Sequence, residues 1–411
     1  MAPEALPKTF LIHFSGPDKP GLTAELTGVI AGYDVRVLDI GHAVVHETLS
    51  LGIFLDLSDE SVYSALKAAL HDRAHGLGLL VRFSRAQPDA IRGYDRHFII
   101  TVLGRTITAA QLMRVSGIIA AHGMNIDRID RLSLELSPED ASANACVELA
   151  VSGHASREAR MRAEFLRLAT EMAIDIAFQR ESIFRRNRRL FAFDMDSTLI
   201  QGEVIDELAR MAGAGERVAR ITAAAMRGEL NFDESFRRRV ALLKGLPAER
   251  VFGLLDTVAF ADGAERLIRT LKLLGYKTAI LSGGFTFFAQ SLQERLGIDY
   301  VHANELEIVD GVVTGRVIPP IINGDRKAAL LGEIAGREGI SLEQVVAVGD
   351  GANDIPMLNL AGMGIAYRAK ALVRQTADQA ISSLGLDGLL YLIGVRDRDL
   401  RPHEAEISGR E

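Results

Sequence analysis

The chain has 411 residues, more than the ~100–200 residues of an ordinary domain, so we expect two to four domains. Hydrophobic residues make up 48% and charged residues 25%, the mixture of a globular protein with buried cores. The net charge of −7 argues against nucleic acid or an anionic membrane as a partner. The lack of a ~18-residue apolar run and of a secretory leader predicts a cytoplasmic protein without membrane spans.

Two local features complete this first survey. Cys146 is the only cysteine, which excludes an intramolecular disulfide and a cysteine-based zinc cluster. It lies in an apolar stretch typical of a half-buried strand, so we expect an inert core residue. A basic run around Arg185 and Arg188 precedes an apolar strand, and we interpret it as a solvated linker face.

Residues 8–86 form the first predicted domain. A strand at 10–14 leads through a tight turn at 16–21 into a helix from Leu22. Strands near 34–40 and 49–57, a helix from Ser61 towards His71 and a strand near 78–83 follow. This β-α-β-β-α-β order predicts a ferredoxin-like α+β fold.

The pattern recurs in residues 95–180, with strands at 97–103, 125–129 and 146–152, helices at 109–121 and 156–172, and a linker helix. The echo of residues 28–31 at 117–120 supports a duplicated fold. Both segments resemble ACT domains, small regulatory modules that bind amino acids. Residues 18–22 match the ligand loop of that family, which implies Asp18 and Gly21 as ligand-binding residues. The second copy has 104–108 in place of this loop.

From 188 to 396, strands alternate with long helices, the pattern of an α/β fold with a doubly wound parallel sheet. The predicted strands are 190–194, 277–282, 345–349 and 364–366. Residues of about 203–262 are too many for a simple crossover and predict a helical cap over the carboxyl edge of the sheet, where such sheets bind ligands. Residues 397–411 are charged and aperiodic, so we predict a mobile tail.

Two carboxylates, Asp194 and Asp196, follow directly on the apolar strand 191–193, with Thr198 two residues further on. Acidic groups at the end of such a strand are costly to desolvate unless a cation compensates, and oxygen ligands suit Mg²⁺. A lone Asp-x-Asp is more often a helix cap beside an exposed carboxylate. Here the strand 278–281 also ends in Ser282 and Gly283, whose hydroxyl and amide groups suit phosphate oxygens.

A third strand end adds more carboxylates. The strand 345–348 runs into Asp350, Asn353 and Asp354, and Lys327 lies earlier, at the start of an apolar helix. Alone, Lys327 would be read as an exposed lysine. In this order, Asp-x-Asp-x-Thr, Ser, Lys and Gly-Asp-x-x-Asn-Asp resemble the haloacid dehalogenase-like phosphatase superfamily.

This resemblance implies phosphoryl transfer in two steps. Asp194 would attack phosphorus and form an aspartyl phosphate, and Asp196 would protonate the leaving alkoxide and later deprotonate water. Mg²⁺ would be held by Asp194, the backbone carbonyl of Asp196, and Asp350. Further implied roles are phosphoryl binding by Ser282, Gly283 and Lys327, orientation of metal and substrate by Asn353 and Asp354, and support of the loop by Thr198.

The predicted cap carries residues that could determine which phosphate ester binds. Glu203 is placed to receive an α-ammonium group, Arg239 to clamp an α-carboxylate, and Phe232 to wall the pocket. Taken alone, such a glutamate more often only favours a helix N-terminus, and such an arginine is more often a surface residue. However, residues 194–207, 228–243, 281–285 and 346–354 look closely like phosphoserine phosphatases. In that family the positions matching Glu203, Arg239, Ser282, Gly283, Lys327 and Asn353 contact substrate.

The resemblance implies hydrolysis of O-phospho-L-serine to L-serine and phosphate, the last step of serine biosynthesis, with regulation by amino acids at the ACT-like domains. Two alternatives stay open: a phosphatase for another small ester, and an amino-acid sensor with a vestigial phosphatase domain. Intact Asp194, Asp196, Lys327 and Asp350 argue against the sensor. We also predict a homodimer through edge-to-edge pairing of ACT-like sheets, and L-serine as an effector near Asp18 and Gly21.

Overall fold

The computed structural model describes residues 9–57, 60–85, 97–134, 144–153, 158–255, 257–403 and 407. The chain divides into two compact units, Met1–Gly93 and Tyr94–Glu411. Among the described residues, no helix is both long enough and apolar enough to cross a membrane.

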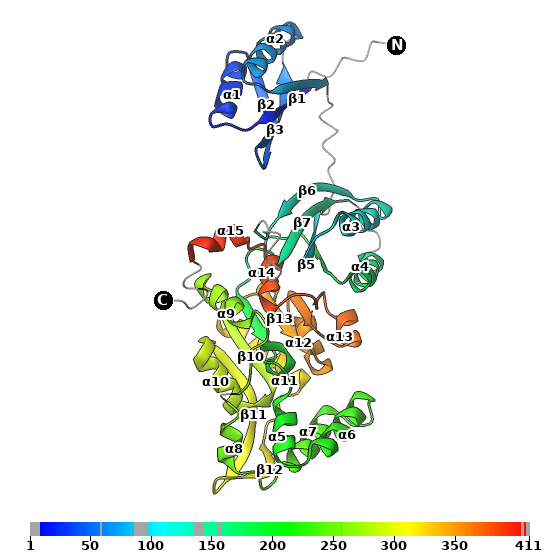
Figure 1. Ribbon diagram of the computed structural model, residues 1–411, viewed down its shortest axis with the longest axis vertical. Helices are drawn as coiled ribbons and strands as arrows, with labels where there is room; N and C mark the ends of the chain where they lie inside the picture. Colours follow the sequence, from blue (N-terminus) through cyan, green and yellow to red (C-terminus); the bar gives the residue numbers. More distant parts are fainter. Residues whose placement is uncertain are drawn as a thin grey trace. The chain divides into compact units, whose positions relative to one another are not determined.

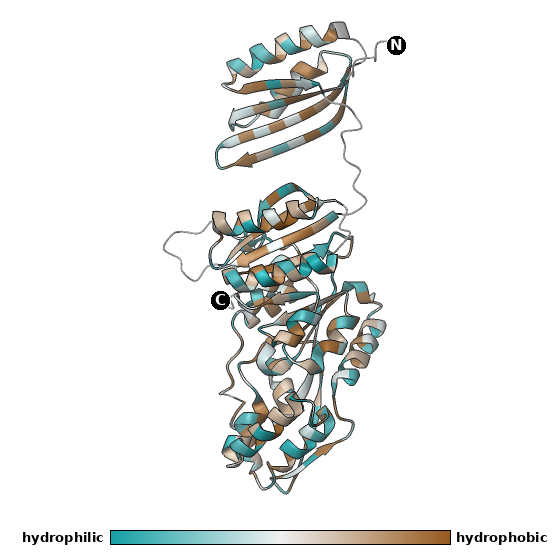
Figure 2. Cartoon of the chain, turned by 90° about the vertical axis from the view of Figure 1, so that its right-hand side faces the viewer, coloured by the Kyte–Doolittle hydropathy of each residue, from teal (hydrophilic) through white to brown (hydrophobic). Residues whose placement is uncertain are grey.

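The first unit is one antiparallel sheet with two helices on one face (Figure 1). Its core is formed by apolar side chains such as Leu26, Ile53 and Leu70, which are fully buried. In Figure 2 the strands change colour from residue to residue, as expected when alternate side chains face the helices. The predicted β-α-β-β-α-β order is confirmed. The strands are β1 (Thr9–Pro17), β2 (Val35–Val45), β3 (Thr48–Leu57) and β4 (Leu80–Arg85), in the order β2-β3-β1-β4, and the helices are α1 (Leu22–Ala31) and α2 (Glu60–Gly76).

The second unit begins with the repeat of this fold, a sheet in the order β6-β7-β5-β8. Its last strand was not predicted, because five of its six residues are buried and the apolar–polar alternation of a half-exposed strand is missing. The elements are β5 (His97–Gly104), α3 (Ala109–Ala121), β6 (Asn125–Arg131), β7 (Ala145–Ser152), α4 (Glu158–Met172) and β8 (Asp175–Arg180).

Buried polar contacts join this repeat to the rest of the second unit. The Asp175 carboxylate accepts hydrogen bonds from the backbone N–H groups of Ser382 and Ser383, both at 2.8 Å. The Gln379 side chain accepts from the Phe178 N–H at 2.8 Å and donates to its carbonyl at 2.9 Å. Because these groups are buried and mutually satisfied, the repeat and the catalytic sheet form one body.

The basic run differs from its prediction. Arg185 forms an ion pair with Glu148 of β7, and both side chains are only 1% exposed. Arg188 is also buried and donates to the backbone carbonyl of Glu343. The prediction of a solvated linker face is therefore wrong at Arg185 and Arg188. Both guanidinium groups are buried, and acceptors distant in sequence compensate their charge. Turns, rather than the predicted linker helix, join β8 to the next strand.

The catalytic part is a seven-stranded sheet in the order β12-β11-β10-β9-β13-β14-β15, parallel except for the edge strand β12. The parallel α/β architecture is confirmed, although β11, β12 and β15 were not predicted. The strands are β9 (Leu190–Phe193), β10 (Lys277–Phe285), β11 (Tyr300–Val309), β12 (Val312–Ile318), β13 (Val345–Gly349), β14 (Met363–Tyr367) and β15 (Gln379–Ile381).

Helices inserted between β9 and β10 form the cap, of which α5, α6 and α7 pack against one another (Figure 1). The cap helices are α5 (Val204–Met211), α6 (Gly215–Met226), α7 (Phe232–Ala241) and α8 (Ala248–Phe252). The other helices are α9 (Ala264–Leu273), α10 (Thr286–Leu296), α11 (Gly324–Arg337), α12 (Ile355–Leu360), α13 (Ala371–Thr376), α14 (Leu389–Leu392) and α15 (Asp397–Leu400).

Residues 397–403 differ from the predicted mobile tail. They form helical turns, and Leu400 is buried in the main core. The Asp397 N–H donates to the carbonyl of Leu132, and its carboxylate accepts from the N–H of Leu134. These partners lie far away in sequence, and the local pattern of residues 397–403, which has no periodicity, gives no sign of them. Of the remaining tail, only Ile407 lies within the described residues. The domain bounds stay predictions.

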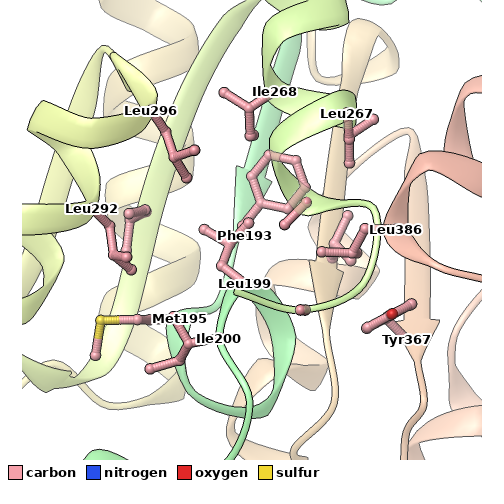
Figure 3. Packing of buried hydrophobic residues seen from close by; sticks show 14 of the residues in the cluster. Phe193, Met195, Leu199, Ile200, Leu267, Ile268, Leu292, Leu296, Tyr367 and Leu386 are labelled. Atoms are coloured by element: carbon pink, nitrogen blue, oxygen red, sulfur yellow. The ribbon is translucent and has the colours of Figure 1, made fainter. Parts of the chain in front are cut away.

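A large core supports the end of β9. Phe193 and Leu199, on either side of the two aspartates, pack among Leu267, Ile268 and Leu292 (Figure 3). All are buried. Close packing of this kind leaves the loop between Phe193 and Leu199 little freedom to move.

Candidate active site

Asp194 lies at the carboxyl end of the central strand. β9 and β13 pair in parallel, with Phe193 opposite Val348, so the residues that follow the two strands meet at one edge of the sheet. The Asp194 N–H donates to the Val348 carbonyl at 2.9 Å. Its carboxylate is almost fully buried and accepts from the N–H of Met195 at 2.7 Å.

A cluster of three carboxylates forms at this edge. Ligand oxygens of Asp194, Asp350 and Asp354 lie within 4.8 Å of one another. Burial and the negative charges of Asp194 and Asp354 raise the pKa of Asp350 to about 8. Burial, followed by the charge of Asp194, raises the pKa of Asp354 to about 7. So many hard oxygen donors in so little space fit a divalent cation of the Mg²⁺ type.

Lys327 is the buried counter-charge of this cluster. Its Nζ lies 2.9 Å from an Asp194 oxygen and 2.6 Å from an Asp354 oxygen. Burial alone would lower the pKa of Lys327, but the two carboxylates raise it above its ordinary value. The residue is therefore a permanent cation, and the reading of an exposed lysine is excluded.

Asp196 occupies a different environment from Asp194. The turn Met195–Leu199 is irregular, with a left-handed φ of 55° at Ser197, and it points the Asp196 side chain towards the end of β10. The Asp196 carboxylate accepts from the Val204 N–H at 3.0 Å. Burial and then the charge of Glu203 raise its pKa well above the ordinary value. Asp196 therefore favours the protonated form that a general acid needs.

The end of β10 supplies the neighbouring wall. Ser282 is fully buried, and its Oγ accepts from the Gly284 N–H at 2.9 Å. A Cβ atom at Gly284 would lie 2.5 Å from an Asp196 oxygen, so glycine is required there. The sequence places Gly284 with Ser282 and Gly283 at this strand end, but its close approach to Asp196 is visible only in the structure. Thr198 is buried, with Oγ1 3.5 Å from an Asp350 oxygen, which suits a supporting role.

A cavity of about 1190 Å³ opens between this edge and the cap. Most of the residues that we predicted for the site line it, whereas Ser282, Lys327 and Asp354 are fully buried next to it. Asp18 and Gly21 lie in the exposed turn before α1 of the first unit and do not belong to this site. The predicted residues that line the cavity are Asp194, Asp196, Glu203, Phe232, Arg239, Gly283, Asp350 and Asn353.

The cap contributes opposite charges to the cavity. Arg239 of α7 has a buried Nε without a hydrogen-bond partner among the described residues. Glu203 directly precedes α5 and accepts from the Ser197 hydroxyl at 3.2 Å. Desolvation in the cavity and the charge of Asp194 raise the pKa of Glu203. Asp206 and Lys370 also line the cavity, and sequence reasoning missed both.

The aromatic wall is formed by Phe232. Its ring stacks on Phe236 with centroids 5.8 Å apart. A Cβ atom at Gly283 would lie 3.0 Å from the tip of the Phe232 ring, so the cap and the end of β10 are in close approach. This contact places a flat apolar surface beside Gly283 at the end of β10.

Comparison with known proteins agrees with this architecture. Residues 191–359 match the haloacid dehalogenase-like hydrolase family, and residues 8–84 and 96–179 each match ACT domain families. Two solved structures are similar. A HAD family hydrolase of Salmonella enterica shares 31% identity over 72% of this chain and 99% of its own, with a TM-score of 0.62. A probable phosphoserine phosphatase of Vibrio cholerae shares 32% identity over 74% and 88%, with a TM-score of 0.57.

Two curated relatives extend the similarity along nearly the whole chain. A phosphoserine phosphatase of Streptomyces coelicolor is 43% identical over 391 residues, which cover 94% of this chain and 92% of the relative. A phosphoserine phosphatase of Mycobacterium tuberculosis is 41% identical over 97% of this chain and 96% of its own. With identity above 40% along nearly the whole of both relatives and the match of residues 191–359 to the hydrolase family, this chain belongs to the phosphoserine phosphatase family of haloacid dehalogenase-like hydrolases.

Proposed function

We propose that this chain hydrolyses O-phospho-L-serine to L-serine and inorganic phosphate, with Mg²⁺ as its cofactor. One observation carries the proposal. A single cavity joins the carboxylate cluster at the ends of β9 and β13 to Glu203 and Arg239 of the cap. The curated relatives, which are phosphoserine phosphatases, support the same substrate.

Asp194 is the nucleophile in this proposal. Lys327, whose Nζ lies 2.9 Å from an Asp194 oxygen, offsets the negative charge of this carboxylate as the phosphate dianion approaches. A carboxylate oxygen of Asp194 forms a bond to phosphorus while the bond to the serine oxygen breaks, and an aspartyl phosphate results. Water then attacks the same phosphorus, releases phosphate and restores the Asp194 carboxylate.

Asp196 moves the protons of both steps. Its raised pKa keeps a proton available for the serine alkoxide as that group leaves. The resulting carboxylate then accepts a proton from the attacking water, which returns Asp196 to its starting form. Burial against Gly284 limits competing access of solvent to this carboxyl group.

The carboxylates of Asp194 and Asp350 and the backbone carbonyl of Asp196 are the proposed holders of Mg²⁺, with Asp354 beside them. When bound, the ion would neutralise negative charge on the phosphoryl oxygens. Ser282, Gly283 and Lys327 are assigned to the phosphoryl group, and Asn353 to the orientation of the substrate. Thr198 and Asp354 hold these groups in place.

Substrate choice rests on the cap. The Nε of Arg239 has no hydrogen-bond acceptor in the part of the chain that the structure describes, and an α-carboxylate would supply one. Glu203 would receive the α-ammonium group, and Phe232 would pack against the short carbon chain. Phosphoserine carries all three features on one small molecule.

The ACT-like regions are proposed to support a dimer and its regulation. β2 is an edge strand of the first sheet, and several of its apolar residues are exposed, including Ile40 at 49% and Val45 at 68%. Pairing of two such edges in a homodimer would cover them. L-Serine bound near Asp18 and Gly21 is the proposed effector. It is the product of the proposed reaction, so its accumulation would signal that enough serine is present.

The test is phosphate release from O-phospho-L-serine with Mg²⁺, with chelator, and by the Asp194→Asn variant. Phosphothreonine and an aryl phosphate serve as competing substrates. We expect a strong preference for phosphoserine, loss of activity with chelator, and a decrease in kcat of at least about 10³-fold for the variant. Turnover of the aryl phosphate alone would refute the substrate, and full activity of Asp194→Asn would refute the nucleophile.

A further inference from the structure

Lys370 lies at the same sheet edge as the catalytic carboxylates. It follows β14, the strand next to β13, and directly precedes helix α13. Its side chain lines the cavity together with Asp194 and Asp350. The ammonium group therefore shares one cavity with the catalytic carboxylates.

The cavity is strongly acidic for a site that must admit an anion. Three cationic residues line it, Arg237, Arg239 and Lys370, against a larger number of carboxylates. Arg237 lies 4.0 Å from Asp233, and Lys327 is buried between two carboxylates. Mg²⁺ and Lys327 offset charge at the carboxylate cluster itself, but a phosphate monoester that approaches through the cavity also meets the other lining carboxylates, whose repulsion a further unpaired cation would reduce. The lining carboxylates are Asp194, Asp196, Glu203, Asp206, Asp233, Glu234, Asp325 and Asp350.

Among the described residues, Lys370 has no carboxylate within ion-pair distance. Its Nζ lies 3.9 Å from the Met226 sulfur at the end of cap helix α6, a weak contact for an ammonium group. Met226 and Leu372, which also line the cavity, are 62% and 60% exposed. Lys370 thus lies beside exposed apolar side chains of the cap and the core, on the part of the cavity wall that is open to solvent.

We propose that Lys370 is a positioning residue that draws the phosphate group of the substrate into the cavity and holds it near the carboxylate edge before the chemical step. This role rests on the proposed function, because it takes a phosphate monoester as the ligand. Lys370 acts on the phosphate and not on the amino-acid head, which Glu203 and Arg239 recognise. It lowers the cost of bringing a dianion to an acidic site, and it takes no part in bond breaking.

The test compares Lys370→Met, Lys370→Arg and wild type in steady-state hydrolysis of O-phospho-L-serine and an aryl phosphate. Methionine keeps an unbranched chain against Met226 and removes only the charge. For Lys370→Met we expect kcat/KM to fall about 5- to 20-fold at low ionic strength for both esters, mainly through KM. The deficit should shrink above ~0.5 M salt, because screening removes the advantage of wild type. Lys370→Arg should restore most of kcat/KM.

Arg374→Gln is the matched control. It removes one positive charge from the same helix α13, but Arg374 lines a separate groove between α4 and α13, not the catalytic cavity. We expect its kcat/KM and salt dependence to match those of wild type. Thermal melting of all variants checks the fold.

Three outcomes separate the possibilities. An unchanged kcat/KM and salt dependence in a folded Lys370→Met would overturn the role of Lys370 and leave the proposed function intact. Loss of kcat without a change in KM would overturn it too, because steering acts before chemistry. If wild type turns over the aryl phosphate but not phosphoserine, the proposed substrate is refuted. The role of Lys370 is then still tested by comparing the variants with the aryl phosphate.

Discussion

Asp350 shows that the charges gathered at the site lower the stability of the folded protein. Its carboxyl group is surrounded by Asp194 and Asp354, and a pKa of about 8 means that the folded protein holds a proton there at neutral pH. The unfolded chain releases that proton near the ordinary value of about 4. Between these two pH values the folded state binds more protons, so the free energy of unfolding falls as pH rises. The active site is thus a source of instability until a cation binds.

The prediction is that Asp350→Asn raises the melting temperature of the metal-free protein at pH 8. Removing a buried negative charge relieves its repulsion with Asp194, and about 1 kcal/mol corresponds to about 2–4 °C. Below about pH 4 the difference should disappear, because Asp350 is then protonated in both states. Calorimetric melts from about pH 3 to pH 8, with and without Mg²⁺, make the measurement. Mg²⁺ should stabilise wild type more than the variant; a variant that melts lower than metal-free wild type at pH 8 would contradict this account.

At the scale of elements, helix α7 carries the selectivity of the cap. It begins at Phe232, capped by Asn231, and its inner face directs Phe232, Phe236 and Arg239 towards the sheet. The outer face carries Arg238, which pairs with Glu234 at 2.5 Å and is exposed. Two adjacent arginines therefore differ only in the face of the helix on which they lie.

We predict that Arg239→Lys raises KM for phosphoserine about 10- to 100-fold, because lysine cannot form a bidentate pair with a carboxylate. An aryl phosphate has no α-carboxylate, so its KM should change less than about 2-fold. Arg238→Lys, the control on the opposite face, should leave both substrates unaffected. Steady-state kinetics with the two esters make the comparison. Equal losses for both esters would show that Arg239 supports the fold and not the choice of substrate.

At the scale of the whole molecule, the two ACT-like repeats have different surroundings. The sheet of the second repeat contributes Leu103, Leu132, Cys146 and Ala177 to the main core of the catalytic unit. The first repeat forms a unit of its own, with a separate core and an exposed edge strand β2. The second repeat therefore supports the catalytic sheet, and the proposed self-association and effector binding fall to the first repeat.

The corresponding prediction is that Ile40→Lys, on β2, converts the dimer into monomers of 44.6 kDa. A charge on a paired edge is costly to bury, whereas Leu80→Lys on the opposite edge strand β4 should leave the dimer intact. Light scattering after size exclusion gives the masses, and titration calorimetry with L-serine reports effector binding in wild type, Ile40→Lys and Asp18→Ala. A monomeric wild type would refute the dimer, and unchanged serine binding by Asp18→Ala would refute the effector site.

Much of the fold was predictable because its signals are local. The apolar strand before Asp194, the turn before Leu22 and the ACT-like element order are patterns within short windows, and the structure has those elements. The strand-end positions of Asp194, Ser282 and Asp350 also predicted their meeting, since parallel strands bring their carboxyl ends to one edge. Composition and motif order were therefore enough for the fold class and for the chemistry of the core.

Burial and neighbourhood depended on the tertiary structure. Lys327, Arg185 and Arg188 look like surface cations in sequence. Their buried charges are compensated by groups that folding brings near them: Asp194 and Asp354 for Lys327, Glu148 for Arg185, and the Glu343 carbonyl for Arg188. The strand β8 lost its alternation because both its faces are covered, and residues 397–403 are held by partners far away in the chain. Gly284 and Lys370 likewise belong to the site because the fold brings them next to the catalytic residues. A residue's type and its local pattern are written in the sequence, but the free energy of burying it depends on which groups the fold brings into contact with it.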